Sequence, residues 1–239
     1  EVGLGVAAAR LADYRGASHG RAYALPVPYG IYRGDRLKLD RDQNRFRIFS
    51  TATYSIDWSA AVSQPVKSKD TPMRTGMPDI DASVEWGPQL KIALGERWKL
   101  QTRAHLVSTY ENDRLHERGY TVTPSINWEL PLPHDLSLGA RLAAPFASER
   151  YHDYFYRVLP EYAQPGRPAY DADAGFSGWN TQITLSRRTR HAWYGFFVSN
   201  HFMEDSTVEN SPLIDDKTSW SAGFACTWLL FQSKEMTTE

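Results

Sequence analysis

Residues 120–146 read YTVTPSINWELPLPHDLSLGARLAAPF, and this stretch decides the fold. From Tyr120 to Leu130, every even-numbered residue is apolar and every odd-numbered residue is polar. Because successive side chains of a strand point to opposite sheet faces, the segment has one apolar face and one polar face. After a short break at 131–134, the alternation resumes over 136–146. The stretch therefore predicts two long antiparallel strands joined by a tight turn.

The same alternation recurs along the chain and predicts about twelve strands, with roughly ten as the alternative count. The predicted strands cover residues 2–8, 23–31, 37–39, 46–48, 54–62, 80–94, 98–106, 120–130, 136–146, 179–185, 194–202 and 220–230. Long polar loops near 13–20, 65–79, 111–118, 149–173 and 204–217 alternate with short turns near 33–35, 95–96, 131–134 and 187–190. Long loops at one rim and short turns at the other are typical of a transmembrane β-barrel.

Composition restricts the class of protein. The chain has 239 residues, a mean hydropathy of −0.51 and no apolar run long enough for a membrane-spanning helix. Tilted strands of about 9–11 residues cross a bilayer, and only a closed sheet pairs every backbone polar group in lipid. The net charge of −1 gives no field that attracts nucleic acid, and a single cysteine excludes an intrachain disulfide. We therefore expect one closed antiparallel barrel over residues 1–231, followed by a polar C-terminal tail at 232–239.

A soluble β-sandwich or lipocalin-like barrel is the alternative, with the apolar face turned inward. About twelve strands with several large apolar residues each would overfill such an interior, and the alternation of loop lengths would have no cause. The tryptophans favour the membrane barrel, because all but one fall on the apolar face and several lie near strand ends, where an aromatic girdle belongs. The predicted girdle consists of Trp58, Trp86, Trp98, Trp128, Trp179, Trp220 and Trp228.

The polar face of the strands would line the lumen, and it carries both signs of charge. The predicted lumen network consists of Asp57, Asp81, Glu85, Lys99, Arg103, His105, Glu129 and Arg141. It has two interpretations: a selective polar channel, or mutually compensating charges that fill a narrow bore. The second is favoured because a barrel of this size has little free bore. A turn at 95–96 would place Glu85 near His105 across the strand pair. It would also place Gln89 near Arg103 or Gln101.

Candidates for catalysis and metal binding lie near the long-loop rim. His152, Asp153, Ser199, His201 and Ser206 are residue types that hydrolases use, but no local motif joins a nucleophile, a base and an oxyanion site. Four acidic residues suit calcium, and solvated turns explain them equally well; they are Asp171, Asp173, Asp215 and Asp216. The sequence therefore predicts no catalytic residues, no cofactor and no metal site.

The loop at 149–173 is rich in aromatic side chains, namely Tyr151, Tyr154, Phe155, Tyr156 and Tyr162. A ligand site is one interpretation of such a loop. Folding over the mouth of the barrel is the more common use, because these apolar rings need cover from water. We therefore expect this loop to close over the mouth.

Short segments distributed along the chain carry a family resemblance. They are LPVPY at 25–29, GMPDID at 76–81, WGPQL at 86–90, YTVTPS at 120–125, YFY at 154–156, PAYD at 168–171 and, after Asp205, NSPLI at 210–214. As an ordered set, covering nearly the whole chain, they resemble the MltA-interacting protein (MipA/OmpV) family of outer-membrane proteins. The C-terminus departs from the pattern, since barrels of this class usually end on an aromatic residue and here a polar tail follows.

The resemblance implies the outer membrane of a Gram-negative bacterium and a scaffolding or adaptor role in the cell envelope. Members are described as linking a lytic murein transglycosylase to a peptidoglycan synthase, and the barrel would contact outer-membrane lipid and lipopolysaccharide. A narrow porin-like channel or transporter for small solutes is the alternative. Because Glu1 opens directly into a strand-like run, we expect that a signal peptide has already been removed.

Overall fold

The computed structural model describes residues 2–30, 32–33, 37–39, 44–111 and 113–231. The strands are β1 (Val2–Ala12), β2 (Gly20–Gly30), β3 (Tyr32–Arg33), β4 (Leu37–Leu39), β5 (Asn44–Ser50), β6 (Tyr54–Val62), β7 (Ser83–Ala93), β8 (Trp98–Glu111), β9 (Arg114–Leu132), β10 (Leu136–Ala143), β11 (Phe146–Ala147), β12 (Gly175–Phe176), β13 (Trp179–Arg188), β14 (Ala192–Phe202) and β15 (Thr218–Phe231). The helices are α1 (Glu149–Tyr156) and the 3-10 turns η1 (Ser68–Asp70), η2 (Pro72–Arg74) and η3 (Pro160–Tyr162). The predicted turn at 33–35 and tail at 232–239 lie wholly or partly outside the described residues.

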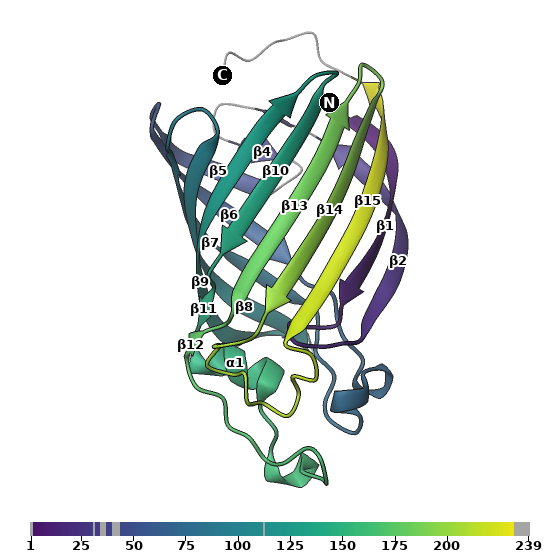
Figure 1. Ribbon diagram of the computed structural model, residues 1–239, viewed down its shortest axis with the longest axis vertical. Helices are drawn as coiled ribbons and strands as arrows, with labels where there is room; N and C mark the ends of the chain where they lie inside the picture. Colours follow the sequence, from purple (N-terminus) through teal and green to yellow (C-terminus); the bar gives the residue numbers. More distant parts are fainter. Residues whose placement is uncertain (1, 31, 34–36, 40–43, 112, 232–239) are drawn as a thin grey trace.

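One antiparallel sheet contains all of these strands. Its hydrogen-bonded order is β2-β1-β15-β14-β13-β10-β9-β8-β7-β6-β5-β4-β3, with β11 and β12 beside the end of β9. The two ends of this path, β2 and β3, are successive strands of the chain, separated only by residue 31. Figure 1 shows the tilted strands wrapping around a common long axis. The all-β prediction is confirmed.

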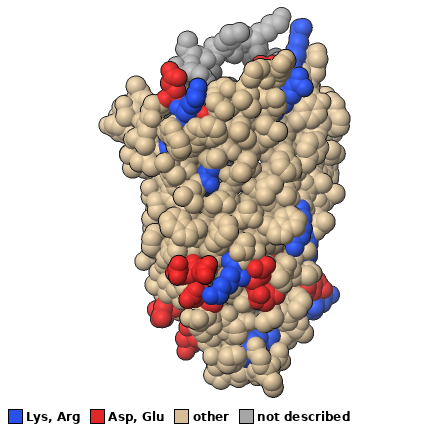
Figure 2. All heavy atoms as spheres, in the orientation of Figure 1, with Lys and Arg blue, Asp and Glu red and all other residues tan. Residues whose placement is uncertain are grey.

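The apolar face of the strands points outward. Ile183 of β13 and Phe224 of β15 are 56% and 49% exposed, whereas Asp57 and Gln89 on the opposite face are fully buried. This is the reverse of a water-soluble barrel, in which the apolar face fills the interior. Figure 2 shows a broad band almost free of Lys, Arg, Asp and Glu, with charged side chains gathered towards the two ends. The soluble alternative therefore does not describe this chain.

All seven predicted girdle tryptophans lie on outward-facing strand positions. Six of them are between 40% and 53% exposed: Trp58, Trp86, Trp98, Trp179, Trp220 and Trp228. Trp128 is half-buried because its ring lies 6.4 Å from that of Trp98, its direct cross-strand partner. Trp98 lies near the start of β8 and Trp228 near the end of β15, at one end of the sheet. Trp179 and Trp220 lie near the starts of β13 and β15, at the other end.

The connections segregate by length. Val2 pairs with Phe231, so the start of β1 and the end of β15 share one rim, together with the short turns 94–97, 133–135 and 189–191. The other rim carries the connections 13–19, 63–82, 144–178 and 203–217 (Figure 1). The predicted alternation of long loops and short turns is confirmed for these segments.

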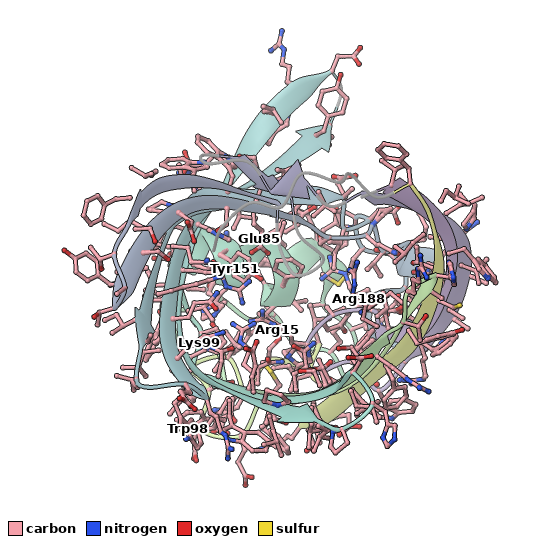
Figure 3. All side chains as sticks on the ribbon, turned by 90° about the horizontal axis from the view of Figure 1, so that it is seen from above. Arg15, Glu85, Trp98, Lys99, Tyr151 and Arg188 are labelled. Atoms are coloured by element: carbon pink, nitrogen blue, oxygen red, sulfur yellow. The ribbon has the colours of Figure 1, made fainter. Side chains whose placement is uncertain are left out.

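Two predicted boundaries are wrong. Residues 111–118 were expected to be a charged loop, but β8 and β9 pair as far as Glu111 and Arg114, and their hairpin extends away from the ring in Figure 3. The strand expected from Ile80 begins only at Ser83. Ile80 pairs with Val66 in an isolated bridge and is 2% exposed, because it belongs to a core formed by the long loops.

We call the four connections of the long-loop rim, together with α1, the cap. Their buried apolar core consists of Tyr14, Ala17, Val66, Ile80, Tyr156, Val158, Ala172, Met203, Val208 and Leu213. Polar contacts join the same segments: the Tyr14 hydroxyl donates to the Leu213 carbonyl at 2.7 Å, and that of Ser211 donates to the Tyr156 carbonyl at 2.7 Å. The expectation that the aromatic loop covers the mouth of the barrel agrees with this arrangement.

Two buried arginines hold the cap loops together. Arg74 donates to the carbonyls of Phe155 and Pro78, and Arg167 donates to those of Met73, Thr75 and Tyr162. Both side chains are less than 5% exposed. Because an unpaired buried guanidinium is costly, such multiple contacts fix the loops relative to one another.

Helix α1 lies against β9, where the sequence predicted only an irregular loop. Ser148 is its N-cap, and the Ser148 hydroxyl also accepts a hydrogen bond from the backbone N–H of Tyr120 at 3.0 Å. The close approach needs Gly119, whose φ is +95° and which has no room for a Cβ beside Ser148. The helix thereby lies across the mouth of the lumen (Figure 3).

Candidate functional site

The inward-facing polar side chains form pairs near the short-turn rim. Lys99 lies 2.7 Å from Glu129, and Gln101 donates to Gln89 at 2.8 Å. Asp57 is fully buried on β6 and accepts from the Ser55 hydroxyl at 3.4 Å. The Lys99 and Glu129 side chains are 43% and 54% exposed, so the lumen is hydrated at this end.

The predicted strand register is confirmed further along the lumen. Gln89 is the direct partner of Arg103, and His105 Nδ1 lies 3.8 Å from Glu85 Oε2. The other ring nitrogen of His105, Nε2, lies 2.8 Å from the Ser59 hydroxyl. Asp81, in contrast, precedes β7 and lies in the cap connection, where its backbone N–H donates to the Tyr154 hydroxyl. Its predicted place on a membrane-spanning strand is wrong because β7 begins only after the Val66–Ile80 bridge.

A polar cavity of about 170 Å³ lies in the lumen between these pairs and the cap. Its lining consists of Arg15, Glu85, Arg103, His105, Thr121, Thr123, Arg141, Ala143, Pro145, Asn180 and His201. Three of these are arginines, and they come from three separate elements: the first cap connection, β8 and β10. Figure 3 shows Arg15, Glu85 and Tyr151 together in the central space, with Lys99 inside the wall and Trp98 outside it.

The charges around the cavity do not compensate one another. Within the described part of the chain, the side chains of Arg15, Arg103 and Arg141 form no hydrogen bond or ion pair. The Nε atom of Arg141 is buried without a partner. Glu85 attracts Arg15 and Arg103 at longer range, but it is the only carboxylate of the lining. Lys99 and Glu129 thus compensate each other, whereas the lining of this cavity has an excess of positive charge.

Arg15 is the site residue that sequence patterns did not reveal. It lies in a cap connection, outside every alternating segment, so strand periodicity says nothing about it. Contacts on both sides fix its backbone: its carbonyl accepts from the Tyr156 hydroxyl at 3.1 Å, and the N–H of Gly16 donates to Ser219. The pairing of Asn180 with His201 was also missed; their side chains lie 2.9 Å apart, at the start of β13 and the end of β14.

Two serine–histidine contacts bear on catalysis. Besides Ser59 and His105, His152 of α1 lies 2.7 Å from the Ser177 hydroxyl and 2.6 Å from the Asp173 carbonyl. Ser59 and Ser177 are 1% and 4% exposed, and neither lines the lumen cavity. A nucleophile must reach its substrate, and an oxyanion site must lie beside it. These contacts therefore serve to hold β6 to β8 and α1 to the 173–177 segment.

His152 makes the stability of the cap dependent on pH. The side chain is fully buried, and burial together with the charge of Arg15 lowers its pKa, against the opposing hydrogen bond to Asp173. Below the ordinary histidine pKa of about 6.5, the unfolded chain takes up a proton that the folded chain does not. We expect the free energy of unfolding to fall by at most about 1.4 kcal/mol per pH unit as the pH drops below about 6.5.

Urea unfolding in lipid vesicles at pH 7.5, 6.5 and 5.5 measures this loss. His152→Gln should unfold with a weaker pH dependence than the unmodified chain, and the exposed His134→Gln serves as the control. Equal pH dependence in His152→Gln and the unmodified chain would show that groups other than His152 cause the loss of stability at low pH.

The described residues contain no cluster of three or more His, Cys, Asp or Glu side chains in metal-binding geometry. None of the helices in the described part of the chain is long and apolar enough to span a membrane.

Comparison with known proteins identifies the family. Residues 3–230 match the family model described as MltA-interacting protein MipA. The chain belongs to the MipA family. No curated protein matches it at a significant level. The predicted family resemblance is thereby confirmed, and this MipA family member is an outer-membrane β-barrel protein of a Gram-negative bacterium.

One solved structure shares the fold of this MipA family member, and a second gives a weaker alignment. A crystal structure of an outer-membrane channel from Pseudomonas putida F1 aligns with a TM-score of 0.53 at 12% identity, covering 95% of this chain and 94% of the channel. The NanC porin aligns with a TM-score of 0.47 at 7% identity, covering 95% of this chain and all of the porin. At such low identity the first match shows the fold alone.

Proposed function

We propose that the sheet closes into a ring of about twelve strands, in which its two end strands, β2 and β3, count as one. The order of the sheet supports this, because its two ends are neighbours in the chain. Closure also removes both sheet edges, whose unpaired backbone groups lipid does not tolerate. The short-turn rim would face the periplasm and the cap would face outside, with the outward tryptophans at the two lipid interfaces. Residues 1–231 would then make up a single barrel domain.

We infer that this barrel is an envelope adaptor that binds periplasmic peptidoglycan-remodelling enzymes at its short-turn rim. The observation that carries the proposal is the cap, whose packed apolar core lies across one mouth of the barrel and would obstruct solutes there. The description of the family as MltA-interacting supports a murein transglycosylase as one partner, and a peptidoglycan synthase would be the second. The outward face would contact outer-membrane lipid and lipopolysaccharide. The proposal assigns the chain no catalytic role.

A narrow channel for small solutes is the second candidate function. The arginine-lined cavity favours it, because such a lining suits the passage or capture of anions. The shared fold with a bacterial outer-membrane channel agrees with this candidate without supporting any particular solute. The two candidates differ in whether the intact protein conducts.

Site-specific photo-crosslinking in intact envelopes tests the adaptor. A photoreactive residue at His134 or His191, in the turns of the short-turn rim, should yield an adduct with an MltA-type transglycosylase by mass spectrometry. The same residue at Glu161 in the cap is the matched control and should give no such adduct. Adducts from Glu161 alone, or no transglycosylase adduct from either turn position, would contradict the adaptor.

A further inference from the structure

The lumen cavity has an excess of positive charge. Arg15, Arg103 and Arg141 contribute three guanidinium groups, which stay charged in proteins. Glu85 contributes one negative charge, and it lies beside His105 as well as near two of the arginines. The lining therefore carries a net charge of about +2 when both of its histidines are neutral, from three positive groups and one negative group.

Placing these arginines together is electrostatically unfavourable. Arg141 lies within electrostatic reach of Arg103 and Arg15, both of which repel it, and its Nε is buried without a hydrogen-bond partner. Desolvation adds to the cost, because a buried charge needs both a counter-charge and hydrogen bonds. The Nε of Arg74 in the cap is likewise unpaired, but the terminal nitrogens of Arg74 and Arg167 donate to several carbonyls. The arginines of the cavity have no such contacts among the described residues.

We propose that the cavity binds a small, doubly charged oxyanion, a phosphate or a dicarboxylate, between Arg15, Arg103 and Arg141. Guanidinium groups match the oxygens of both anions with paired, charge-assisted hydrogen bonds. The hydroxyls of Thr121 and Thr123 add neutral donors to the same lining. A dianion would cancel the excess charge of about +2 in the lining.

The space and its access suit a solute of this size. A volume of about 170 Å³ is well above the roughly 10–15 Å³ that one water molecule needs. Tyr151 of α1 lies over the central space on the cap side (Figure 3). On the other side, the half-exposed Lys99 and Glu129 show that the lumen is hydrated towards the short-turn rim. The anion would therefore enter from that rim and stop beneath the cap.

Calorimetric titration of the detergent-solubilised full chain tests this site. Inorganic phosphate, succinate and neutral glucose are each titrated at constant ionic strength, and the first two arms separate a phosphate site from a dicarboxylate site. We expect one dianion to bind at one site per chain, and Arg141→Gln or Arg103→Gln to weaken its affinity at least about tenfold. Lys99→Gln is the matched control, since it removes a positive charge from the same strand about 13 Å away and should change the affinity less than about threefold.

Thermal melting provides a second readout, and its ligand-free measurement does not depend on how well a variant binds. Without ligand, Arg141→Gln should melt at or above the temperature of the unmodified chain, because it relieves repulsion within the arginine cluster. The dianion that binds should raise the melting temperature of the unmodified chain and not that of Arg141→Gln. Binding of neither dianion, equal weakening by Lys99→Gln, or a ligand-induced shift that persists in Arg141→Gln would each overturn the proposal. None of these readouts involves a protein partner. The adaptor proposal can therefore be contradicted while the anion site is confirmed, and the anion site can be contradicted while the adaptor proposal is confirmed.

Discussion

Replacing residues 150–172 by a short Gly-Ser linker is expected to turn a silent barrel into a conducting one. The segment contains α1, which lies across the mouth of the lumen, and contributes Tyr156, Val158 and Ala172 to the core of the cap. Neither β9 nor β13 loses a ladder hydrogen bond, so the barrel should remain. In planar bilayers we expect little or no steady conductance from the unmodified chain and at least about a tenfold increase after the replacement.

A matched deletion controls for loop length. Removing the paired residues 108–111 and 114–117 shortens the β8–β9 hairpin at the same rim without touching the apolar core of the cap. This variant should stay silent. A large, steady conductance in the unmodified chain would favour the channel over the adaptor. Silence after the 150–172 replacement would show that the lumen side chains alone close the bore.

Ile183→Arg is expected to destabilise the barrel by about 2–4 kcal/mol, the cost of an arginine facing lipid near the bilayer midplane. Ile183 is 56% exposed in the middle of β13, and its direct neighbours across the sheet are Ala140 and Val198. None of these neighbours offers a polar partner, so the guanidinium must reach towards an interface or draw water into the lipid.

Ser186→Arg is the control on the same strand. Ser186 points to the lumen, and its cross-strand partners are Ser137 and Gly195, of which Gly195 is covered by the Trp193 ring. The new guanidinium would there reach a polar, hydrated lumen, and we expect a cost below about 1 kcal/mol. Reversible unfolding by urea in lipid vesicles measures both variants. Equal costs at Ile183 and Ser186 would contradict an outward lipid-facing surface.

Most of the barrel is predictable from the sequence because each strand carries its own pattern. Alternation identifies which face of β8 and β9 is apolar, and a tight turn then fixes which residues oppose each other. Glu85 beside His105 and Gln89 beside Arg103 follow from that counting, and the structure bears both out. Such local rules work wherever strand neighbours are also neighbours in the chain.

Apart from the folding of the aromatic loop over the mouth, the cap and the cavity were not predictable, since they depend on contacts between residues distant in the sequence. Ile80 and Asp81 continue the alternation of β7, yet packing against Val66 draws them out of the sheet. Helix α1 is short, and its N-cap serine serves equally to bind β9. Arg15 reaches the cavity only because Tyr156 and Ser219 hold the backbone around it. None of these contacts leaves a periodic pattern.

The pairing of β1 with β15 has a consequence for the order of events during assembly. Val2 meets Phe231 and Arg10 meets Ala222, so this seam joins the most N-terminal and the most C-terminal of the described strands. Contacts with such large sequence separation form slowly, because the entropy of closing the intervening chain is lost before the contact is gained. Formation of the cap depends on the same pairing, since the Tyr14 hydroxyl donates to the carbonyl of Leu213, 199 residues further along the chain. An incompletely inserted barrel would therefore have an open seam and unprotected loops, and the protease resistance of the cap would report that insertion is complete.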